Sequence, residues 1–543
     1  MDKKIQLLDC TLRDGAYIVN AEFGMPAMKG IMKKMQDANV DILECGWLKD
    51  APHKEGTTFF HVPDDLKRYL PEKSSRVLYV AMIDWDRYQV DTLPVCDGKT
   101  LDAIRVVFPH DKYKEGIAVA EKVAQKGYQI FLQAANTLAY TDEELVELAR
   151  EVNRILPVSL SVVDTFGAMY QEDLDRIVGV LDRELDQKIK LGFHSHNNQQ
   201  LSFALSMHFV ELLAGTDRGC VVDASLCGMG RGAGNATTEL VANYLNRYWH
   251  GNYDMNQIMD AIDMYMAYFQ ERYTWGYSTP YFIAGMYCCH VNNIAYLQQN
   301  HRTNAKDMRS IIESLSPDDR KKYDYDLLEQ KYMENQNRIV EDEDVLAMLR
   351  KEWEGRELLL IAPGRSSLSQ MEQIKAYIRE KHPVVIGVNA IIPGYTYDYL
   401  FMVNAVRYHY AKEVYTEQFL QTKKILLSNI KTAAEENEWI INFNRVTKRG
   451  WEHFDNAVIN MLRLLDKLHM EKTAIAGFDG FRHQYNESYA DISLPTLNPN
   501  NQWDALNDEI ADMFRDFQSS SGMQVQFLTE SIFNQDENRY TGK

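Results

Sequence analysis

Long apolar runs, paired cysteines and an excess of basic residues are all missing from this chain of 543 residues. No run approaches the roughly 20 apolar residues of a membrane-spanning helix, and the amino-terminal MDKKIQLLDC has no apolar signal core. The sequence therefore predicts a cytoplasmic protein with no membrane partner. A net charge of -19 also argues against nucleic acid as a partner, because phosphate backbones attract basic surfaces.

The seven cysteines are odd in number and include no CxxC pair. They lack the pattern of a disulfide framework, and a zinc site built on thiolates is not expected. Any metal would then need histidine and carboxylate ligands. What remains is an ordinary globular composition, with 45% hydrophobic and 25% charged residues. The chain is too long for one ordinary core, so two or three domains are expected.

Residues 1–250 alternate short β-branched runs with stretches of helical period. Near-continuous apolar strands separated by helices are typical of a parallel sheet that is covered on both faces. Eight such units in about 250 residues predict an α/β fold of the (β/α)8 TIM-barrel type, although the helix after the third strand is poorly marked. The predicted strands are 5–10, 40–46, 76–83, 103–108, 129–133, 158–163, 189–193 and 221–225.

The remainder of the chain has a different pattern. Residues 251–352 carry no strand signal and are expected to form a helical extension and a charged connector. Aromatic residues are frequent over 251–300, which predicts helices that pack on the barrel or form a subunit contact in a homo-oligomer. Residues 353–543 return to apolar runs that end in turns, such as LLLIAPG, and predict a Rossmann-like α/β domain.

Polar side chains gather at the carboxyl ends of the predicted barrel strands, where TIM barrels place their catalytic groups. The sharpest case is His194-Ser195-His196. Residues i and i+2 of a strand point the same way, so both imidazoles project together into the barrel mouth as a workable pair of metal ligands. Two histidines satisfied in the core or at the surface are the alternative. Carboxylates at neighbouring strand ends, above all Asp14, favour the metal.

Two loops add to this picture. DCTLRDG places Arg13 and Asp14 beside a glycine, although a local turn held by an Arg–Asp pair is an alternative. CGMGRGAGN nearly satisfies a dinucleotide fingerprint, but the preceding strand closes a barrel rather than opening a βαβ unit. A backbone loop that binds a carboxylate or phosphate at the helix start is the favoured interpretation.

Three motifs together resemble the signatures of the DRE-TIM metallolyases: DCTLRDG at 9–15, HSHNN at 194–198 and GMGRGAGN at 228–235. This HMG-CoA lyase-like superfamily includes 4-hydroxy-2-oxovalerate aldolase, hydroxymethylglutaryl-CoA lyase and the isopropylmalate and homocitrate synthases. The resemblance covers about residues 1–300, and DTFGAMYQEDL at 164–174 looks most like the pyruvate-type aldolases. It implies an enzyme that makes or breaks a carbon–carbon bond beside a carbonyl, through a metal-bound enolate.

The resemblance also implies roles for individual residues. The implied metal is Mn2+ or Mg2+, with Zn2+ as an alternative, and its ligands are Asp14, His194, His196 and Asn235. The metal would act as a Lewis acid, and Arg13 would stabilise the enolate oxygen. The catalytic residues are expected to be Arg13, Tyr17, Glu44 and His110. Substrate contacts are expected from Thr11, Arg105, Asp164, Gly232 and Gly234. No residue is assigned to an organic cofactor.

The general acid/base is not assigned. The aldolases of this family carry a histidine shortly after RDG, where this chain has Tyr17. Tyr17 either acts through a water or lines the pocket. The other candidates are His110, Tyr281 and His290. His110 fits a loop surface equally well, while Tyr281 and His290 fit packing within the aromatic segment.

The leading hypothesis is a metal-dependent aldolase that joins or separates a 2-oxo acid such as pyruvate and an aldehyde. A sugar derivative in glycan or capsule biosynthesis would suit the aldehyde role. Two alternatives stay open: a Claisen-type acyltransferase that uses an acyl-CoA, and a non-catalytic binding protein on a retained barrel, suggested by Tyr17.

The second domain has weaker signals. APGRSS at 362–367 is a strand-to-helix loop, and GFDGF at 477–481 resembles a strand-end motif of some sugar-handling domains. Asn389, Asn404 and Asn444 each follow a predicted strand, where open α/β sheets bind ligands. These features predict a nucleotide or nucleotide-sugar site. Turns that cap strands and helices are the alternative.

Overall fold

The computed structural model describes residues 4–301, 303–431, 437–451, 453–482, 488–495 and 503–534. The chain divides into two compact units. The barrel unit comprises Met1–Ile294 and Pro317–Lys322, and the second unit comprises Ala295–Ser316 and Tyr323–Lys543. Among the described residues, none of the helices combines the length and apolar character needed to cross a bilayer.

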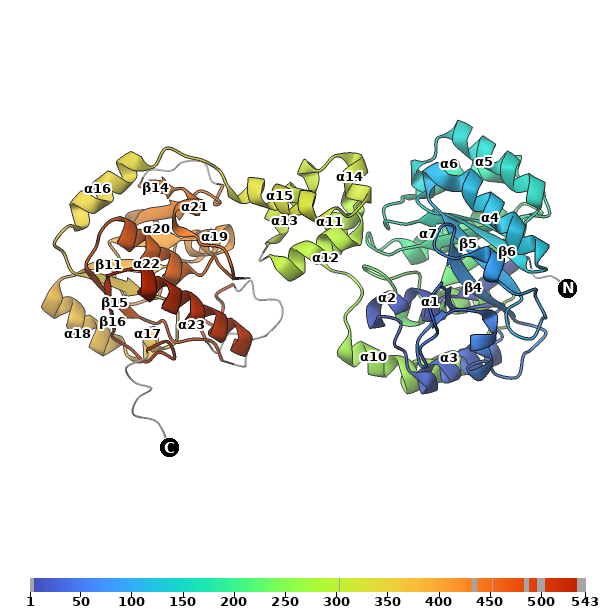
Figure 1. Ribbon diagram of the computed structural model, residues 1–543, viewed down its shortest axis with the longest axis horizontal. Coiled ribbons are helices and arrows are strands. Elements are labelled where there is room, and N and C mark those ends of the chain that lie inside the picture. The colour runs from blue at the N-terminus through green and yellow to red at the C-terminus, as the bar shows by residue number, and fades with distance from the viewer. Residues whose placement is uncertain are drawn as a thin grey trace. The chain divides into compact units, whose positions relative to one another are not determined.

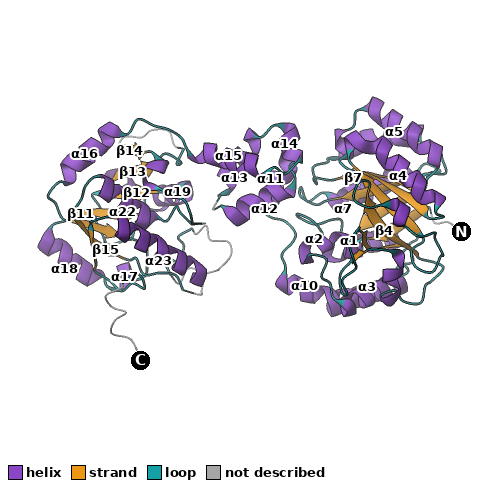
Figure 2. Cartoon of the chain, viewed as in Figure 1, coloured by secondary structure: helices purple, strands orange, loops and turns teal. Residues whose placement is uncertain are grey.

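The barrel unit contains a closed parallel barrel wrapped by helices (Figures 1 and 2). The sheet order is β1-β9-β8-β7-β6-β5-β4-β2, and pairing of β1 with β2 closes it. This confirms the predicted TIM barrel, strand by strand. Its strands are β1 (Ile5–Asp9), β2 (Ile42–Leu48), β4 (Leu78–Asp84), β5 (Ala103–Phe108), β6 (Gln129–Ala134), β7 (Ser159–Asp164), β8 (Lys190–Ser195) and β9 (Cys220–Ala224). The two-residue β3 (Phe59–Phe60) pairs with β2 outside the ring.

Helices follow most of these strands because their apolar residues recur at helical spacing. In α5 the buried residues Leu145, Leu148, Ala149 and Val152 form one stripe, and Thr141 and Glu144 form a capping box at its start. The poorly marked third unit has only a single 3-10 turn at Val90–Thr92 between β4 and β5. The covering helices are α3 (Met25–Asp37), α4 (Tyr113–Gln125), α5 (Asp142–Ile155), α6 (Gln171–Glu184), α7 (Ser202–Ala214) and α8 (Thr238–Tyr248).

Helices also fill the stretch after the barrel. Met266 and Phe269 pack into the barrel core, which ties the π-helical turn and the helix that follows it to the barrel. The segment consists of α9 (Met255–Ala261), a π-helical turn (Ile262–Met266), α10 (Ala267–Arg272), α11 (Thr279–Met286), α12 (Val291–Asn300), α13 (Ala305–Ser314), α14 (Pro317–Lys321), α15 (Tyr325–Gln336) and α16 (Glu343–Trp353).

The second unit is built on a seven-stranded sheet with the order β14-β13-β12-β11-β10-β15-β16. Among the described residues its strands pair in parallel, so the expected second α/β domain contains a parallel sheet. The order runs one way from β10 and then reverses to β15, as in doubly wound sheets. Its strands are β10 (Leu358–Ile361), β11 (Val384–Val388), β12 (Tyr399–Met402), β13 (Lys423–Leu427), β14 (Glu438–Ile441), β15 (Lys472–Ala476) and β16 (Gln524–Phe527).

Both faces of this sheet are buried. Leu358 and Leu360 pack into one apolar cluster, and Leu359 and Ile361 pack into another, because successive side chains of a strand point to opposite faces. The covering helices are α17 (Ser366–Ser369), α18 (Met371–Lys381), α19 (Ala405–Val414), α20 (Thr416–Gln421), α21 (Phe443–Val446), α22 (Ala457–Lys467) and α23 (Trp503–Ser520).

Candidate metal centre at the barrel mouth

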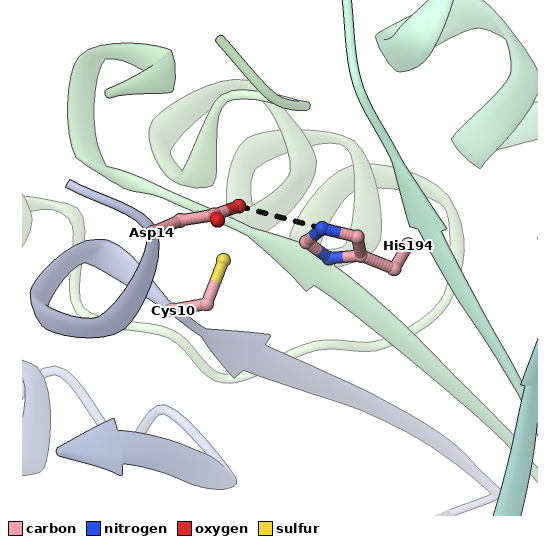
Figure 3. Close-up of side chains that lie close together, drawn as sticks. All are labelled: Cys10, Asp14 and His194. Carbon is pink, nitrogen blue, oxygen red and sulfur yellow. Dashed lines mark ion pairs between the residues drawn. The ribbon is translucent and has the colours of Figure 1, made fainter. Parts of the chain in front are cut away.

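Four of the side chains expected to bind a metal lie together where β1, β8 and the glycine loop meet. Asp14 and His194 approach from opposite sides, with Oδ2 to Nε2 at 3.4 Å (Figure 3). Asn235 donates a hydrogen bond from Nδ2 to Asp14 Oδ2 at 2.5 Å. His196 forms a β-bridge with Asn235, and its ring centre lies 5.1 Å from that of His194. The fold thus brings together residues that are far apart in the chain.

Each histidine is oriented by its other ring nitrogen. His194 Nδ1 lies 3.0 Å from Asp223 Oδ2, and His196 Nδ1 lies 3.1 Å from the carbonyl oxygen of Asp164. Since both acceptors hold the Nδ1 side of the rings, Nε2 is the atom left for a metal. Burial lowers the pKa of His196 to about 4, so its ring is neutral at physiological pH. Burial also opposes charge on His194, but hydrogen bonds to Asp14 and Asp223 outweigh it and raise the pKa.

The donor set fits a divalent cation. Asn235 Oδ1 is buried and has no hydrogen-bond partner among the described residues. Burying such an acceptor costs free energy unless a cation or another donor binds it. With a carboxylate and two imidazoles beside it, this oxygen completes a mixed oxygen and nitrogen set. Cys10 was not expected here, yet its Sγ, Asp14 and His194 lie within 4.8 Å of one another. Burial raises the pKa of the Cys10 thiol well above its usual range.

A buried ion-pair network continues from this cluster. Glu44 accepts hydrogen bonds from Arg13 Nε and from Arg105 Nη1, both at 2.8 Å. Arg13 also pairs with Asp14, and Arg105 pairs with Asp223. The two guanidinium groups and three carboxylates sum to -1 when the histidines are neutral. A divalent cation would turn this balance to +1, which suits an anionic ligand.

Arg105 and Asp223 support the site through contacts with other residues: Asp223 contacts His194 Nδ1, and Arg105 pairs with Asp223 and Glu44. Arg105 has no solvent exposure, and both of its partners are buried carboxylates. It pairs with Glu44 and Asp223, and its expected role as a substrate contact stays a prediction. Asp223 was missed by sequence reasoning. Its signal was a carboxylate inside the apolar strand CVVDA, which is costly unless paired.

Two further residues expected to contact substrate, Thr11 and Asp164, form hydrogen bonds with nearby backbone N–H groups. Thr11 donates to Asp9 at 3.0 Å and accepts from the Leu226 N–H at 2.8 Å. Asp164 accepts from the Ala168 and Met169 N–H groups, and burial raises its pKa to about 7.

The glycine loop turns through left-handed backbone at Gly232 and Gly234, with φ of +67° and +84°. A Cβ at Gly234 would lie 2.0 Å from the carbonyl oxygen of Gly228, so only glycine fits there.

The acid/base candidates fall in three places. Arg231 lies 3.8 Å over the ring of Tyr17 and 3.4 Å from His290 Nε2, so these two candidates share one cation. Tyr17 is 41% exposed, and burial lowers the pKa of His290 to about 3. His110 instead bonds Glu144 at 3.0 Å beside the start of α5. Tyr281 lies half-buried on α11.

Comparison with known proteins places the barrel region among related sequences. Residues 109–264 match the HMGL-like family model, which confirms the predicted resemblance for this part of the barrel. An oxaloacetate decarboxylase of Mycobacterium tuberculosis is 26% identical over 258 residues, which is 47% of this chain and 74% of that protein. A 4-hydroxy-2-oxovalerate aldolase of Salinispora arenicola is 29% identical over 253 residues, 45% of this chain and 70% of that protein.

Among solved structures, the carboxyl transferase domain of Rhizobium etli pyruvate carboxylase matches with a TM-score of 0.48 and 14% identity. The match covers 64% of this chain and 65% of that one.

Proposed function

We propose that this chain, whose barrel contains an HMGL-like domain, is a divalent-metal-dependent lyase of the aldolase type. It would form or cleave the bond between the enolate of a 2-oxo acid, such as pyruvate, and an aldehyde. The observation that carries the proposal is the buried, unsatisfied Asn235 Oδ1 beside Asp14 and His194. Similarity to a 4-hydroxy-2-oxovalerate aldolase and an oxaloacetate decarboxylase supports the reaction class.

Asp14, His194, His196 and Asn235 are the residues that would hold the cation. When bound, it supplies Lewis-acid polarisation of the substrate's keto group. Oxygen and imidazole donors favour Mn2+ or Mg2+, and the nearby Cys10 thiol keeps Zn2+ as an alternative.

Arg13 contributes fixed positive charge in the same place. Glu44 accepts a hydrogen bond from Arg13 Nε at 2.8 Å, and Arg13 is only 4% exposed, so its guanidinium does not need to reorganise during reaction. Preorganised charge of this kind stabilises a developing enolate oxygen. Tyr17 is the proposed proton donor or acceptor, because Arg231 holds its ring at the rim of the barrel mouth.

Exchange of the pyruvate methyl protons in deuterated water tests the proposal on the full chain with Mn2+. We expect rapid exchange that Asp14→Asn and His194→Ala both abolish. His208→Ala is the matched control, because His208 pairs with Asp175 between two outer helices. Absence of exchange in the unaltered protein would favour a binding protein on a retained barrel. Release of free CoA from acetyl-CoA with a 2-oxo acid acceptor would favour the acyltransferase.

A homo-oligomer is also proposed. Met264 and Tyr268 are more than half exposed on the helices that follow the barrel, and exposed apolar side chains that cluster are typical of contact surfaces. Light scattering on the purified chain tests this, and a monomeric mass at micromolar concentration would contradict it.

A further inference from the structure

A cavity in the second unit lies where the order of the sheet reverses. It is lined by the loops that follow β10, β11, β12 and β15, so it sits at the carboxyl edge of the sheet. Crevices at such a reversal are where open α/β sheets bind their ligands. The cavity measures about 820 Å³ including the part open to solvent.

Close backbone contact keeps the floor of this crevice free of side chains. Gly477 has a φ of +76°, and a Cβ there would lie 2.1 Å from the carbonyl oxygen of Ala362. A Cβ at Gly364 would lie 2.2 Å from the carbonyl oxygen of Gly477. Asp479 ties the same two loops together by accepting a hydrogen bond from the Ser366 N–H at 2.7 Å. The loops after β10 and β15 therefore form one surface.

Three asparagines line the crevice, and each uses its oxygen in the same way. Asn389 Oδ1 accepts from the Val403 N–H at 3.2 Å, Asn404 Oδ1 from the Arg407 N–H at 2.9 Å, and Asn456 Oδ1 from the Ile459 N–H at 3.1 Å. Their amide NH2 groups meet no acceptor among the described residues. Asn389 is only 8% exposed and lines the crevice. Its amide N–H donors are therefore available to a ligand that enters the crevice.

Groups of both signs line the crevice: the carboxylates of Asp455 and Asp479 are opposed by two helix amino ends and one guanidinium. Asn404 and Asn456 cap the amino ends of α19 and α22, and helix amino ends favour anions. Arg407 also lines the crevice, with its guanidinium 4.8 Å over the ring of Tyr489. Phe478 and Phe481 form the apolar part of the wall.

We propose that this crevice binds a phosphorylated small molecule. Its phosphate oxygens, which only accept hydrogen bonds, would meet the three asparagine amides and Arg407. Its organic part would lie against Phe478, Phe481 and Tyr489. The backbone already engages one lone pair of each asparagine oxygen, so these side chains offer mainly N–H donors, which phosphate oxygens match. A nucleotide or nucleotide-sugar, expected from the sequence, belongs to this chemical class. The inference is independent of the aldolase proposal.

Isothermal titration of the full chain tests it with three probes: uridine 5′-diphosphate, glucose 1-phosphate and inorganic phosphate. The variants are Asn389→Asp and Asn456→Asp. Aspartate keeps the oxygen that accepts from the backbone N–H, so the local fold persists, but it replaces the amide donor with a negative charge. The control is Asn437→Asp, which adds the same charge on an exposed residue before β14, at the opposite edge of the sheet.

We expect an organic phosphate to bind and each crevice variant to weaken it by about tenfold or more, since hydrogen bonds to charged groups have that strength. The control should bind as the unaltered chain does. Binding of the diphosphate alone would identify the nucleotide as the recognised part, and binding of both organic probes would identify the phosphate. No binding at millimolar concentration, binding of inorganic phosphate alone, or binding that the crevice variants leave unchanged would overturn the proposal. Retention of the thermal midpoint shows that each variant is folded.

Discussion

The barrel mouth and the second-unit crevice both lie at the carboxyl edge of a parallel sheet, but they are built from opposite chemistry. In the barrel mouth the carboxylates and guanidinium groups are buried and paired, and the Nε2 atoms of His194 and His196, the Cys10 thiol and the oxygen of Asn235 remain for a ligand. In the crevice the asparagine oxygens are occupied and the NH2 groups are left over. Under the two proposals, the same residue type would serve a cation in one region and an anion in the other. The deciding factor is which atom the backbone has already engaged.

The largest effect should come from breaking the charge balance of the barrel. Arg105→Ala leaves Glu44 and Asp223 buried without their shared cation, and an uncompensated buried charge typically costs about 3–5 kcal/mol. We expect a loss of that size in urea unfolding. Arg154→Ala is the control, because Arg154 makes an exposed ion pair with Glu151 and should stay within about 0.5 kcal/mol of the parent. Equal losses in both variants would contradict the network.

A smaller effect is expected from the carboxylate behind His194. Asp223→Asn keeps the size of the side chain but weakens the interaction that orients the imidazole. Loss of such an outer partner lowers metal affinity by about 10–100-fold. Competition with a fluorescent chelator measures this for Mn2+. Asp175→Asn, which changes the partner of His208 on the outer helices, should leave the affinity unchanged.

Metal affinity at the barrel mouth should depend on pH. The pKa of His194 is raised above 6.5 by Asp14 and Asp223 despite its burial, so the metal must displace a proton below that raised value. Mn2+ affinity is expected to rise about tenfold per pH unit in that range and to level off above it. Titration in buffers of different ionisation enthalpy counts the released proton. An affinity that does not change from pH 6 upwards would show that metal binding displaces no proton from His194.

The smallest effect tests whether Asn404 is more than a helix cap. Asn404→Ala removes the acceptor for the Arg407 N–H and should cost about 1 kcal/mol. Asn404→Asp retains that acceptor and should be near neutral for stability, while it lowers affinity for the organic phosphate. If the aspartate variant binds as well as the parent, Asn404 is only a cap, and the anion site would depend on Asn389 and Asn456.

Much of the architecture could be predicted from local pattern. The eight barrel strands follow from apolar runs, and the HxH spacing places two imidazoles on one face, because side chains alternate along any strand. The weak third unit was also visible as a missing helical period, and the structure has only a 3-10 turn there.

Pairing between distant residues had to wait for the tertiary structure. Asn235 meets Asp14 across 221 positions, and Arg105 meets Asp223 across 118. The position of Cys10 beside Asp14 and His194, and the direction of the asparagine amides at the crevice, were likewise visible only in the tertiary structure. Hydrophobic periodicity is a local property of the chain, whereas barrel closure and the reversal of strand order decide which polar atoms face each other. Most of the reactive groups could thus be identified from the sequence, whereas the fold determines which of their atoms remain available to a ligand.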